Sequence, residues 1–354
     1  MLKNKNQSNT IKAFLFCLIL CYVISRLKNK LFSKFLDLPE LNQYPVIGIY
    51  AQPSSQKKEY IRQYYQYVLN ANIKWIQMQG AQTVIIPFDE TQEYYDNIFS
   101  KINGILFTGG SLNININIPV DQYQPKTGIN QWTQNAAYLL NKAIKANDEG
   151  DFFPIWGNCQ GFQLLHYIIS GYNYTILNYI TNDFNTTRNA QFFNIESSSL
   201  FQQFDKQNIE YSQKNSPFLY LHELGVTEQD YKYNPSLREF FQILGVSVNS
   251  TSFNDDNAFR YLSIVEGKKY PFLGVQFHPE YTIFETSFDS NHSLESLNIA
   301  SYFSRYFVSL ARKNEHKFSD IQERSSYLSF NYPTVHIEGY LFNQVTFMDR
   351  KQNN

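Results

Sequence analysis

Residues 152–165 read FFPIWGNCQGFQLL, and this stretch carries the strongest fold signal in the chain. Large apolar residues lead into Gly-Asn-Cys-Gln-Gly, and a second apolar pattern follows at helical spacing. A strand, a G-x-C-x-G turn and a helix form the pattern of a nucleophile elbow, with cysteine where serine often stands. The pattern predicts a sharp turn with Cys159 in a strained conformation, while Gly157 and Gly161 keep colliding side chains out of it.

The helix expected at Gln160–Ile169 would begin at Cys159, and Gly171 would supply a left-handed stop. Unpaired N–H groups and the helix dipole at such an N-terminus favour a thiolate over a thiol. The backbone N–H of Gln160 is then a candidate donor to a developing oxyanion. The alternative is a buried, inert cysteine in a glycine-flanked turn.

Short apolar strands alternate with helical patterns on both sides of this stretch. Strands are predicted at Val46–Tyr50, Thr83–Pro87, Gly104–Phe107, Phe152–Trp156 and Phe272–Phe277, and helices at Glu59–Gln79, Gln131–Ala146 and Ser293–Lys313. The polar, aromatic sequence between Gly171 and Lys269 is expected to form antiparallel hairpins and surface loops, and the segment from Ser325 a strand and a loop. This order predicts an α/β fold: a mostly parallel sheet with helices on both faces and antiparallel hairpin insertions.

A nucleophilic Cys159 needs a base, and His278 stands out among the six histidines of the chain. It follows a buried strand in LGVQFHPE, and sites in open α/β sheets gather at the carboxyl ends of strands. Glu280 lies two residues further on. In extended backbone these two side chains point to one side, so Glu280 would orient the imidazole. A His-Pro-Glu triplet by itself is more often an ordinary turn.

The pair Gly109-Gly110 ends the third predicted strand at the same edge of the sheet. Glycines there allow backbone N–H groups to approach a ligand closely. The N–H of Gly110 is therefore the candidate for a second oxyanion donor. The alternative is a tight turn with no further role.

The net charge of −1 and the hydrophobic fraction of 43% indicate a globular chain, and no charged block supports nucleic-acid binding.

The first residues differ in composition from the rest of the chain. Lysines precede the apolar run Ala13–Ile24, and basic residues follow it. The run is shorter than the roughly 20 residues that cross a bilayer. Residues 1–26 are therefore predicted to be a cleaved signal peptide, and the alternative is an uncleaved signal anchor, the only form in which a membrane would be a partner.

Cys17 and Cys21 lie inside that apolar run, so processing would leave Cys159 as the only cysteine. A single thiol forms no internal disulfide, and in an oxidising compartment it is prone to oxidation. Such a thiol is therefore expected to be either buried or catalytic. Glycosylation sequons fit a secretory route as well. They begin at Asn173, Asn185, Asn249 and Asn291.

Taken together, GNCQG, FTGGS and GVQFHPE resemble the class I glutamine amidotransferase superfamily. The closer resemblance is to the γ-glutamyl hydrolase family, whose members are cysteine peptidases that cleave folylpoly-γ-glutamates. PVIGIYAQP, INGILFTGGS, DFFPIWGNCQGFQLL, GKKYPFLGVQFHPE and YFSRYFVSLARKNEHKF resemble successive segments of that family. The resemblance implies a domain over residues 40–320, followed by a C-terminal tail, residues 321–354, that packs on it.

Residue by residue, the resemblance implies that Cys159 is the nucleophile and His278 the general acid/base, with Glu280 in the family's third position. His222, in LYLHELGVT, matches a family histidine close to the site. The expected substrate is a folylpoly-γ-glutamate, hydrolysed through a thioester without cofactor or metal. The expected location is a vacuole, a lysosome or the medium, and a homodimer is left open.

The sequence departs from the family pattern at two positions near these motifs. Thr108 stands where a proline is common, and Gln163 stands where some members have glutamate. Because of both departures, the motifs specify the substrate of this chain less closely. Glutamine and a γ-glutamyl peptide are both amides of the glutamate γ-carboxyl group, so another small γ-glutamyl amide is an alternative substrate. A non-catalytic secreted glycoprotein with this fold is the remaining alternative, and the intact catalytic residues argue against it.

Overall fold

The computed structural model describes residues 18–20, 22–26, 41–54, 66–118, 130–337 and 341–348. The chain divides into two units, residues 1–42 and residues 43–354. In the first unit, residues 18–20 and 22–26 are helical and exposed, and the rest of the predicted signal segment lies outside the described residues. Among the residues that the structure describes, no helix combines the length and the apolar character needed to cross a bilayer.

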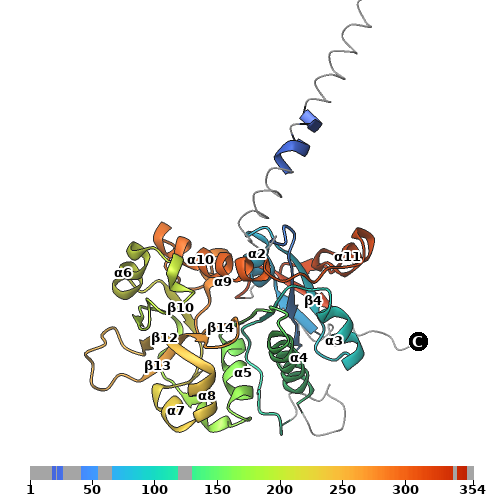
Figure 1. Ribbon diagram of the computed structural model, residues 1–354. Helices are drawn as coiled ribbons and strands as arrows, with labels where there is room; N and C mark the ends of the chain where they lie inside the picture. Colours follow the sequence, from blue (N-terminus) through green and yellow to red (C-terminus); the bar gives the residue numbers. More distant parts are fainter. Residues whose placement is uncertain are drawn as a thin grey trace, which may run out of the picture. The chain divides into compact units, whose positions relative to one another are not determined.

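An eight-stranded sheet in the order β4-β1-β5-β6-β14-β13-β12-β9 organises the second unit (Figure 1). Its strands are β1 Val46–Tyr50, β4 Gln82–Ile86, β5 Ile105–Phe107, β6 Ile155–Asn158, β9 Gln191–Phe192, β12 Phe241–Val248, β13 Arg260–Gly267 and β14 Phe272–Val275. From β4 to β14 neighbouring strands are parallel. The last three strands are added in antiparallel fashion. The predicted mostly parallel α/β sheet is confirmed.

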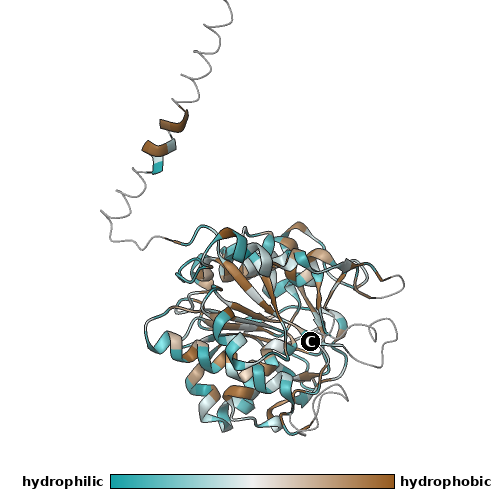
Figure 2. Ribbon diagram, turned by 90° about the vertical axis from the view of Figure 1, so that its right-hand side faces the viewer, coloured by the Kyte–Doolittle hydropathy of each residue, from teal (hydrophilic) through white to brown (hydrophobic). Residues whose placement is uncertain are grey.

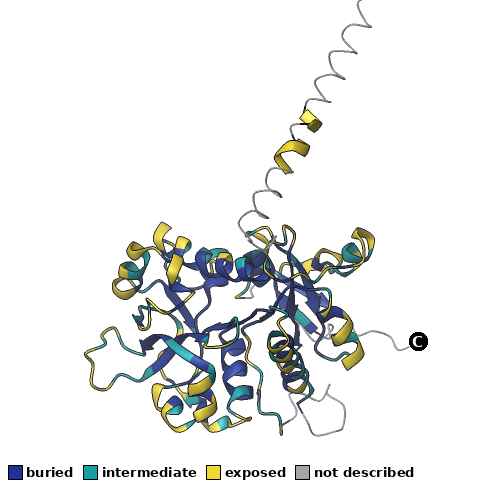
Figure 3. Cartoon of the chain, viewed as in Figure 1, coloured by how far each residue is buried: buried dark blue, intermediate teal, exposed yellow. Residues whose placement is uncertain are grey.

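Helices cover both faces of this sheet, as predicted. They are α2 Asn70–Gln77, α3 Gln92–Phe99, α4 Gln131–Asp148, α5 Gln160–Ile169 and α10 Leu294–Ala311. Alternate residues of β1 face opposite sides: Val46 and Tyr50 pack with α3, α4 and α5, whereas Ile47 and Ile49 pack with α2 and α10. Buried residues accordingly gather in the sheet and on the inner sides of the helices (Figure 3), and apolar strands lie between more hydrophilic outer surfaces (Figure 2).

The insertion between α5 and β12 contains the predicted antiparallel hairpins and, in addition, short helices that the sequence pattern did not indicate. Besides β9, which joins the main sheet, its strands are β7 Asn178–Tyr179, β8 Phe184–Arg188, β10 Phe218–Leu221 and β11 Leu224–Gly225. Strand β7 pairs with β11 and β8 with β10, both antiparallel. Its helical elements are η1 Tyr174–Ile176, η2 Phe201–Gln203, α6 Lys206–Lys214, α7 Glu228–Tyr233 and α8 Pro235–Phe240.

Two sequence-based predictions need correction. The helix expected at Glu59–Gln79 is confirmed over Asn70–Gln77 but is wrong over Gln66–Leu69, which form strand β3; residues 59–65 lie outside the described residues. Strand β3 pairs with a strand near the C-terminus, and this distant partner overrides the local pattern. The strand expected at Phe152–Trp156 begins at Ile155, since Pro154 has no N–H to donate to the ladder.

The C-terminal segment after α10 builds a second sheet. It contains α11 Ile321–Tyr327, η3 Ser329–Asn331, β15 Thr334–Val335 and β16 Val345–Met348. The sheet has the order β15-β16-β3-β2, where β2 is Gln52–Pro53, so β16 is hydrogen-bonded to β3. Helix α9, Pro279–Phe284, follows β14 and lies against α2 and α10 (Figure 1). Through β3 and β2, which follows β1 directly, the second sheet places β16 near the carboxyl edge of the main sheet.

Candidate active site

Cys159 occupies the sharp turn between β6 and α5. Its φ of 48° and ψ of −104° lie in a region that a residue with a side chain rarely adopts, so the predicted strain is confirmed. Its N–H donates to Val275 O at 2.8 Å, and its carbonyl accepts from Gln163 N at 3.0 Å. The side chain is only 3% exposed. Backbone strain held in place by such packing is typical of functional sites.

The two glycines beside this cysteine are required by close backbone contacts. A Cβ atom on Gly161 would lie 2.1 Å from the carbonyl oxygen of Phe107, and a Cβ atom on Gly157 would lie 2.6 Å from the carbonyl carbon of Gly161. Both distances are far below van der Waals contact. The G-x-C-x-G spacing thus allows β5, β6 and α5 to meet at the turn.

His278 and Glu280 lie at the same edge of the sheet and contact each other. The Nδ1 atom of His278 is 2.9 Å from Oε1 of Glu280, and both side chains are buried. The expected extended geometry is wrong, because His278 is the N-cap of α9 and Glu280 lies in its first turn. The carboxylate reaches the imidazole because the helix begins immediately after His278.

The electrostatic surroundings of His278 stabilise its protonated form. Burial lowers the pKa of the imidazole, but the negative charges of Cys159 and Glu280, and hydrogen bonds to both, outweigh burial and raise it to about 10. The arrangement therefore favours an imidazolium at His278 beside Cys159, and a neighbouring imidazolium is the kind of partner that activates a cysteine nucleophile.

Asn158 is a neighbour of this pair that the sequence analysis missed. Its Nδ2 donates to Oε2 of Glu280 at 2.9 Å, and its Oδ1 accepts from Nε1 of Trp156 at 2.7 Å. All three side chains are fully buried. A polar residue at the end of an otherwise apolar strand, one position before the cysteine, is the signal that could have indicated it.

The glycine turn after β5 lies directly against the cysteine and the histidine. A Cβ atom on Gly109 would lie 2.5 Å from Cε1 of His278 and 3.4 Å from Cβ of Cys159. A Cβ atom on Gly110 would lie 2.6 Å from Oε1 of Gln160. That glutamine amide exchanges hydrogen bonds with the backbone of Leu112, at 3.2 and 2.7 Å, and so fixes the loop after the glycines.

The backbone of Gln160 is suited to anion binding. Gln160 is the first residue of α5, where a backbone N–H has no partner within the helix. Gly110, in the loop after β5, approaches its side chain. The two residues predicted as oxyanion donors are thus adjacent, beside Cys159.

His222 lies between β10 and β11, also buried, at 4% exposure. Its Nδ1 is 2.9 Å from the carbonyl oxygen of Leu224, so Nδ1 carries the proton, and its Nε2 has no hydrogen-bond partner in the part of the chain that the structure describes. Burial lowers its pKa to about 3; the bond to Leu224 opposes this, and the charges of His278 and Arg188 lower it further. His222 is therefore a neutral imidazole near His278.

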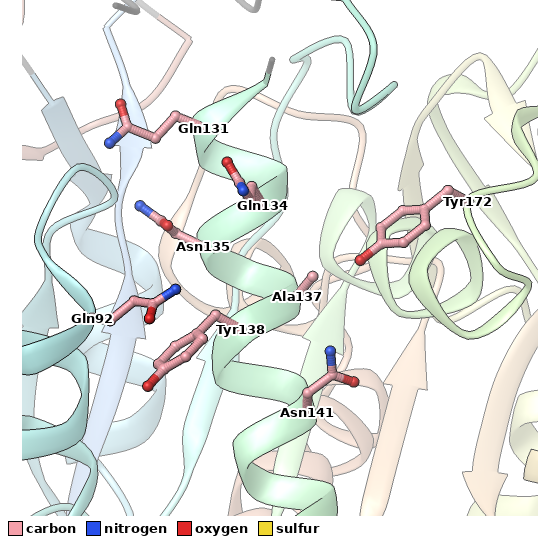
Figure 4. Close-up of a pocket in the computed structure, with 8 residues that line it drawn as sticks. All are labelled: Gln92, Gln131, Gln134, Asn135, Ala137, Tyr138, Asn141 and Tyr172. Atoms are coloured by element: carbon pink, nitrogen blue, oxygen red, sulfur yellow. The ribbon is translucent and has the colours of Figure 1, made fainter. Parts of the chain in front are cut away.

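No cluster of three or more histidine, cysteine, aspartate or glutamate side chains suited to a metal ion occurs among the described residues. A groove of about 430 Å³ runs along the outer side of α4 (Figure 4). It is lined by Gln92, Gln131, Gln134, Asn135, Ala137, Tyr138, Asn141 and Tyr172. None of the predicted site residues is among them, so this groove is separate from the cysteine and histidine.

Comparison with known proteins gives consistent matches. The sequence pattern of a protein family described as Peptidase C26 matches residues 45–280. The γ-glutamyl hydrolase of Bos taurus is 30% identical over 296 residues, which are 82% of this chain and 85% of that protein. γ-Glutamyl hydrolase B of Dictyostelium discoideum is 29% identical and covers 90% of this chain and 91% of its own length. A solved structure of a GMP synthase component from Thermoplasma acidophilum is 14% identical, with a TM-score of 0.44, and covers 76% of this chain and 94% of that one.

Proposed function

The chain belongs to the peptidase C26 family and is a hydrolase of the γ-glutamyl hydrolase type, and we propose that it cleaves folylpoly-γ-glutamates with Cys159 as nucleophile. The relatives are named γ-glutamyl hydrolases, and this supports the γ-glutamyl bond as the bond that is cleaved. The observation that carries the cysteine mechanism is the strained Cys159 beside a charge-paired His278, with Glu280 hydrogen-bonded to the far side of the imidazole.

In the first half-reaction the thiolate sulfur of Cys159 attacks the carbonyl carbon of the γ-glutamyl amide, and the carbonyl electrons move to oxygen. The N–H groups of Gln160 and Gly110 donate to this oxyanion. Donors of this kind contribute about 2.7–4 kcal/mol each to the transition state. The C–N bond then breaks, the imidazolium of His278 gives its proton to the departing amine, and a thioester remains.

In the second half-reaction neutral His278 removes a proton from water as the water oxygen attacks the thioester carbonyl. The tetrahedral intermediate collapses, the C–S bond breaks and the thiolate is restored beside the imidazolium. The products are a free γ-carboxylate and the amine released before. Glu280 holds Nδ1 throughout, so that Nε2 is the atom that exchanges protons.

His222 has a different role in this proposal. With a pKa of about 3 it has no proton to give near neutral pH, and its protonated Nδ1 is bound to Leu224. The unpartnered Nε2 is a hydrogen-bond acceptor. We assign it to holding an N–H group of the substrate or the attacking water near His278.

The test separates this function from its alternatives. Purified protein is incubated with a γ-linked oligoglutamate folate and, separately, with glutamine, and the products are resolved by chromatography. Shortened folates support the proposal. Release of ammonia from glutamine with intact folate supports a hydrolase of small γ-glutamyl amides, and no product from either supports a non-catalytic binding protein. Cys159→Ala is the control: it should fold and lose essentially all turnover, and iodoacetamide should label only the unsubstituted site.

A further inference from the structure

The imidazole of His278 has an aromatic ring lying flat on one face. The ring centroid of Tyr281 is 4.3 Å from that of His278, and the two planes differ by only 9°. Tyr281 lies in α9 and is 2% exposed. Glu280 contacts the edge of the imidazole while Tyr281 covers its face, so the two fix both the direction and the plane of the ring.

The C-terminal tail packs against Tyr281. The ring of Phe342 is 5.0 Å from that of Tyr281, and Phe288 completes the aromatic cluster at 5.9 Å from Tyr281. The next tail residue is tied to the end of α9: Asn343 N donates to Glu285 Oε2 at 2.7 Å. Its Nδ2 also donates to the carbonyl of α9 residue 284 at 3.1 Å.

We propose that Tyr281, backed by Phe342 of the C-terminal tail, is a positioning residue that holds the imidazolium of His278 beside Cys159. The proposal rests on the acid/base role assigned to His278 above. It makes the tail part of the active-site machinery, although the tail lies outside residues 45–280, to which the family pattern extends.

The physical basis is the electron-rich face of the phenol ring. An aromatic face attracts a cation placed over it, and the attraction is strongest where water is excluded. Burial, the largest cause, and the negative charge of Glu280 raise the pKa of Tyr281 well above its usual value, so the ring stays neutral. A neutral ring stabilises imidazolium without supplying a competing charge.

Other titratable groups surround this stack. His278 itself is faced by Cys159 and Glu280, and its charge is felt at His222. Tyr281 interacts with Tyr67 and with Glu285. Unlike Cys159 and Glu280, Tyr281 can be replaced without adding or removing a formal charge beside His278, which makes it suitable for substitution.

The direct test measures how the rate of Cys159 alkylation by iodoacetamide depends on pH, with the modified peptide identified by mass spectrometry. Loss of the aromatic face in Tyr281→Leu should weaken the ion pair and raise the pH of half-maximal alkylation by about one unit. Tyr281→Phe, which keeps the face, should match wild type. Tyr281→trifluorophenylalanine keeps the ring shape but weakens the face, and should fall between the two.

A shape-only role would leave the trifluoro variant equal to Tyr281→Phe, and that result overturns the electrostatic part of the proposal. Phe342→Ala should shift the alkylation curve in the same direction as Tyr281→Leu, and a wild-type curve overturns the role of the tail. Phe330→Ala is the matched control, since this tail phenylalanine is 69% exposed. If Tyr281→Leu fails to fold, the trifluoro and Phe342→Ala variants decide the question.

Alkylation needs no substrate, so the two proposals fail separately. If wild-type protein cleaves no γ-glutamyl compound but the variants show the predicted shifts in alkylation, the proposed function is contradicted. The inference about the ion pair of Cys159 and His278 is then retained. Protein that cleaves folate oligoglutamates but shows unshifted variants contradicts the stacking inference alone. In an active enzyme, Tyr281→Leu should lower kcat more than it changes KM, because the ring contacts His278 rather than the substrate.

Discussion

The amide of Asn158 donates a 2.9 Å hydrogen bond to the carboxylate of Glu280, which lies 122 residues further along the chain. The residue immediately before the cysteine thus holds the carboxylate that orients the histidine. Strands β6 and β14 are neighbours in the sheet, and this pairing brings the two motifs together. The segment that precedes Cys159 and the segment that carries His278 therefore share one hydrogen-bonded network, which begins at Trp156 and ends at His278.

Replacing Asn158 by leucine should impair both stability and catalysis. Oε2 of Glu280 would lose this partner in a buried position, at a cost of about 1–3 kcal/mol in the free energy of unfolding. The freed carboxylate would also orient His278 less well and reduce kcat. Denaturant unfolding and steady-state kinetics measure the two effects. Trp156→Phe, which removes only the outer hydrogen bond, should have a smaller effect on kcat, and wild-type turnover in Asn158→Leu would contradict the network.

The two buried histidines should differ strongly in importance. Loss of a general acid/base costs about 10²–10⁴-fold in rate. His278→Asn should therefore lose at least that much in kcat/KM. His222→Asn should lose less, because neutral His222 contributes only an acceptor. Side-by-side kinetics of the two purified variants test the ranking, and the reverse order would reject the assignment.

Gly109→Ala should lower catalytic activity much more than it lowers the stability of the fold. The added Cβ would lie 2.5 Å from His278 Cε1, so the imidazole must move, and a displacement of about 1 Å in a catalytic group can cost about 10²-fold. Gly150→Ala is the control: this glycine has a φ of +88° and open space around it, so alanine there strains only the backbone. The control should lower the melting temperature and keep kcat. Equal activity of the two variants would argue against contact between Gly109 and His278.

The buried His166 should make the folded state sensitive to acid. Burial lowers its pKa to about 4, partly opposed by the hydrogen bond to Phe162 O. In the unfolded chain the imidazole of His166 is therefore protonated below about pH 6.5, whereas in the folded chain it is protonated only below about pH 4. The associated stability is present above pH 6.5 and is lost as the pH falls toward 4.

Urea unfolding of wild type and His166→Gln at pH 7 and pH 5 measures this contribution. Wild type should lose about 2 kcal/mol more than the variant between the two pH values, since each pH unit in this window contributes about 1.4 kcal/mol. Other titrating groups are common to both proteins and cancel in the difference. Parallel losses in the two proteins would show that His166 is protonated in the folded state.

We propose that the chain enters the secretory route and acts in an acidic vacuole, a lysosome-like compartment or the medium. The basic-flanked apolar run and the four sequons downstream of it motivate this, and the asparagines of these four sequons are not buried. Glycosidase treatment should increase the mobility of the purified protein on a gel. N-terminal sequencing should find a start between residues 25 and 44 if the signal is cleaved, or the intact N-terminus if it is an anchor. A full-length, glycosidase-insensitive protein in the cytosolic fraction would contradict both forms.

The sequence by itself determined the features that depend on a few neighbouring residues. Strand Val46–Tyr50 and helix Gln160–Ile169 have the predicted bounds, because an apolar run or an apolar stripe between strong turn signals specifies an element locally. The strained turn at Cys159 follows from glycine spacing in the same way. The contact between His278 and Glu280 was also predicted, since only one residue separates them.

Only the tertiary structure decided the features that join distant segments. Gln66–Leu69 form a strand because β16 supplies a partner about 280 residues later, and no local pattern contains that information. The contacts of Asn158 with Glu280 and of Phe342 with Tyr281 likewise join separate parts of the chain. Such contacts depend on which strands are neighbours, and strand order is a property of the whole fold.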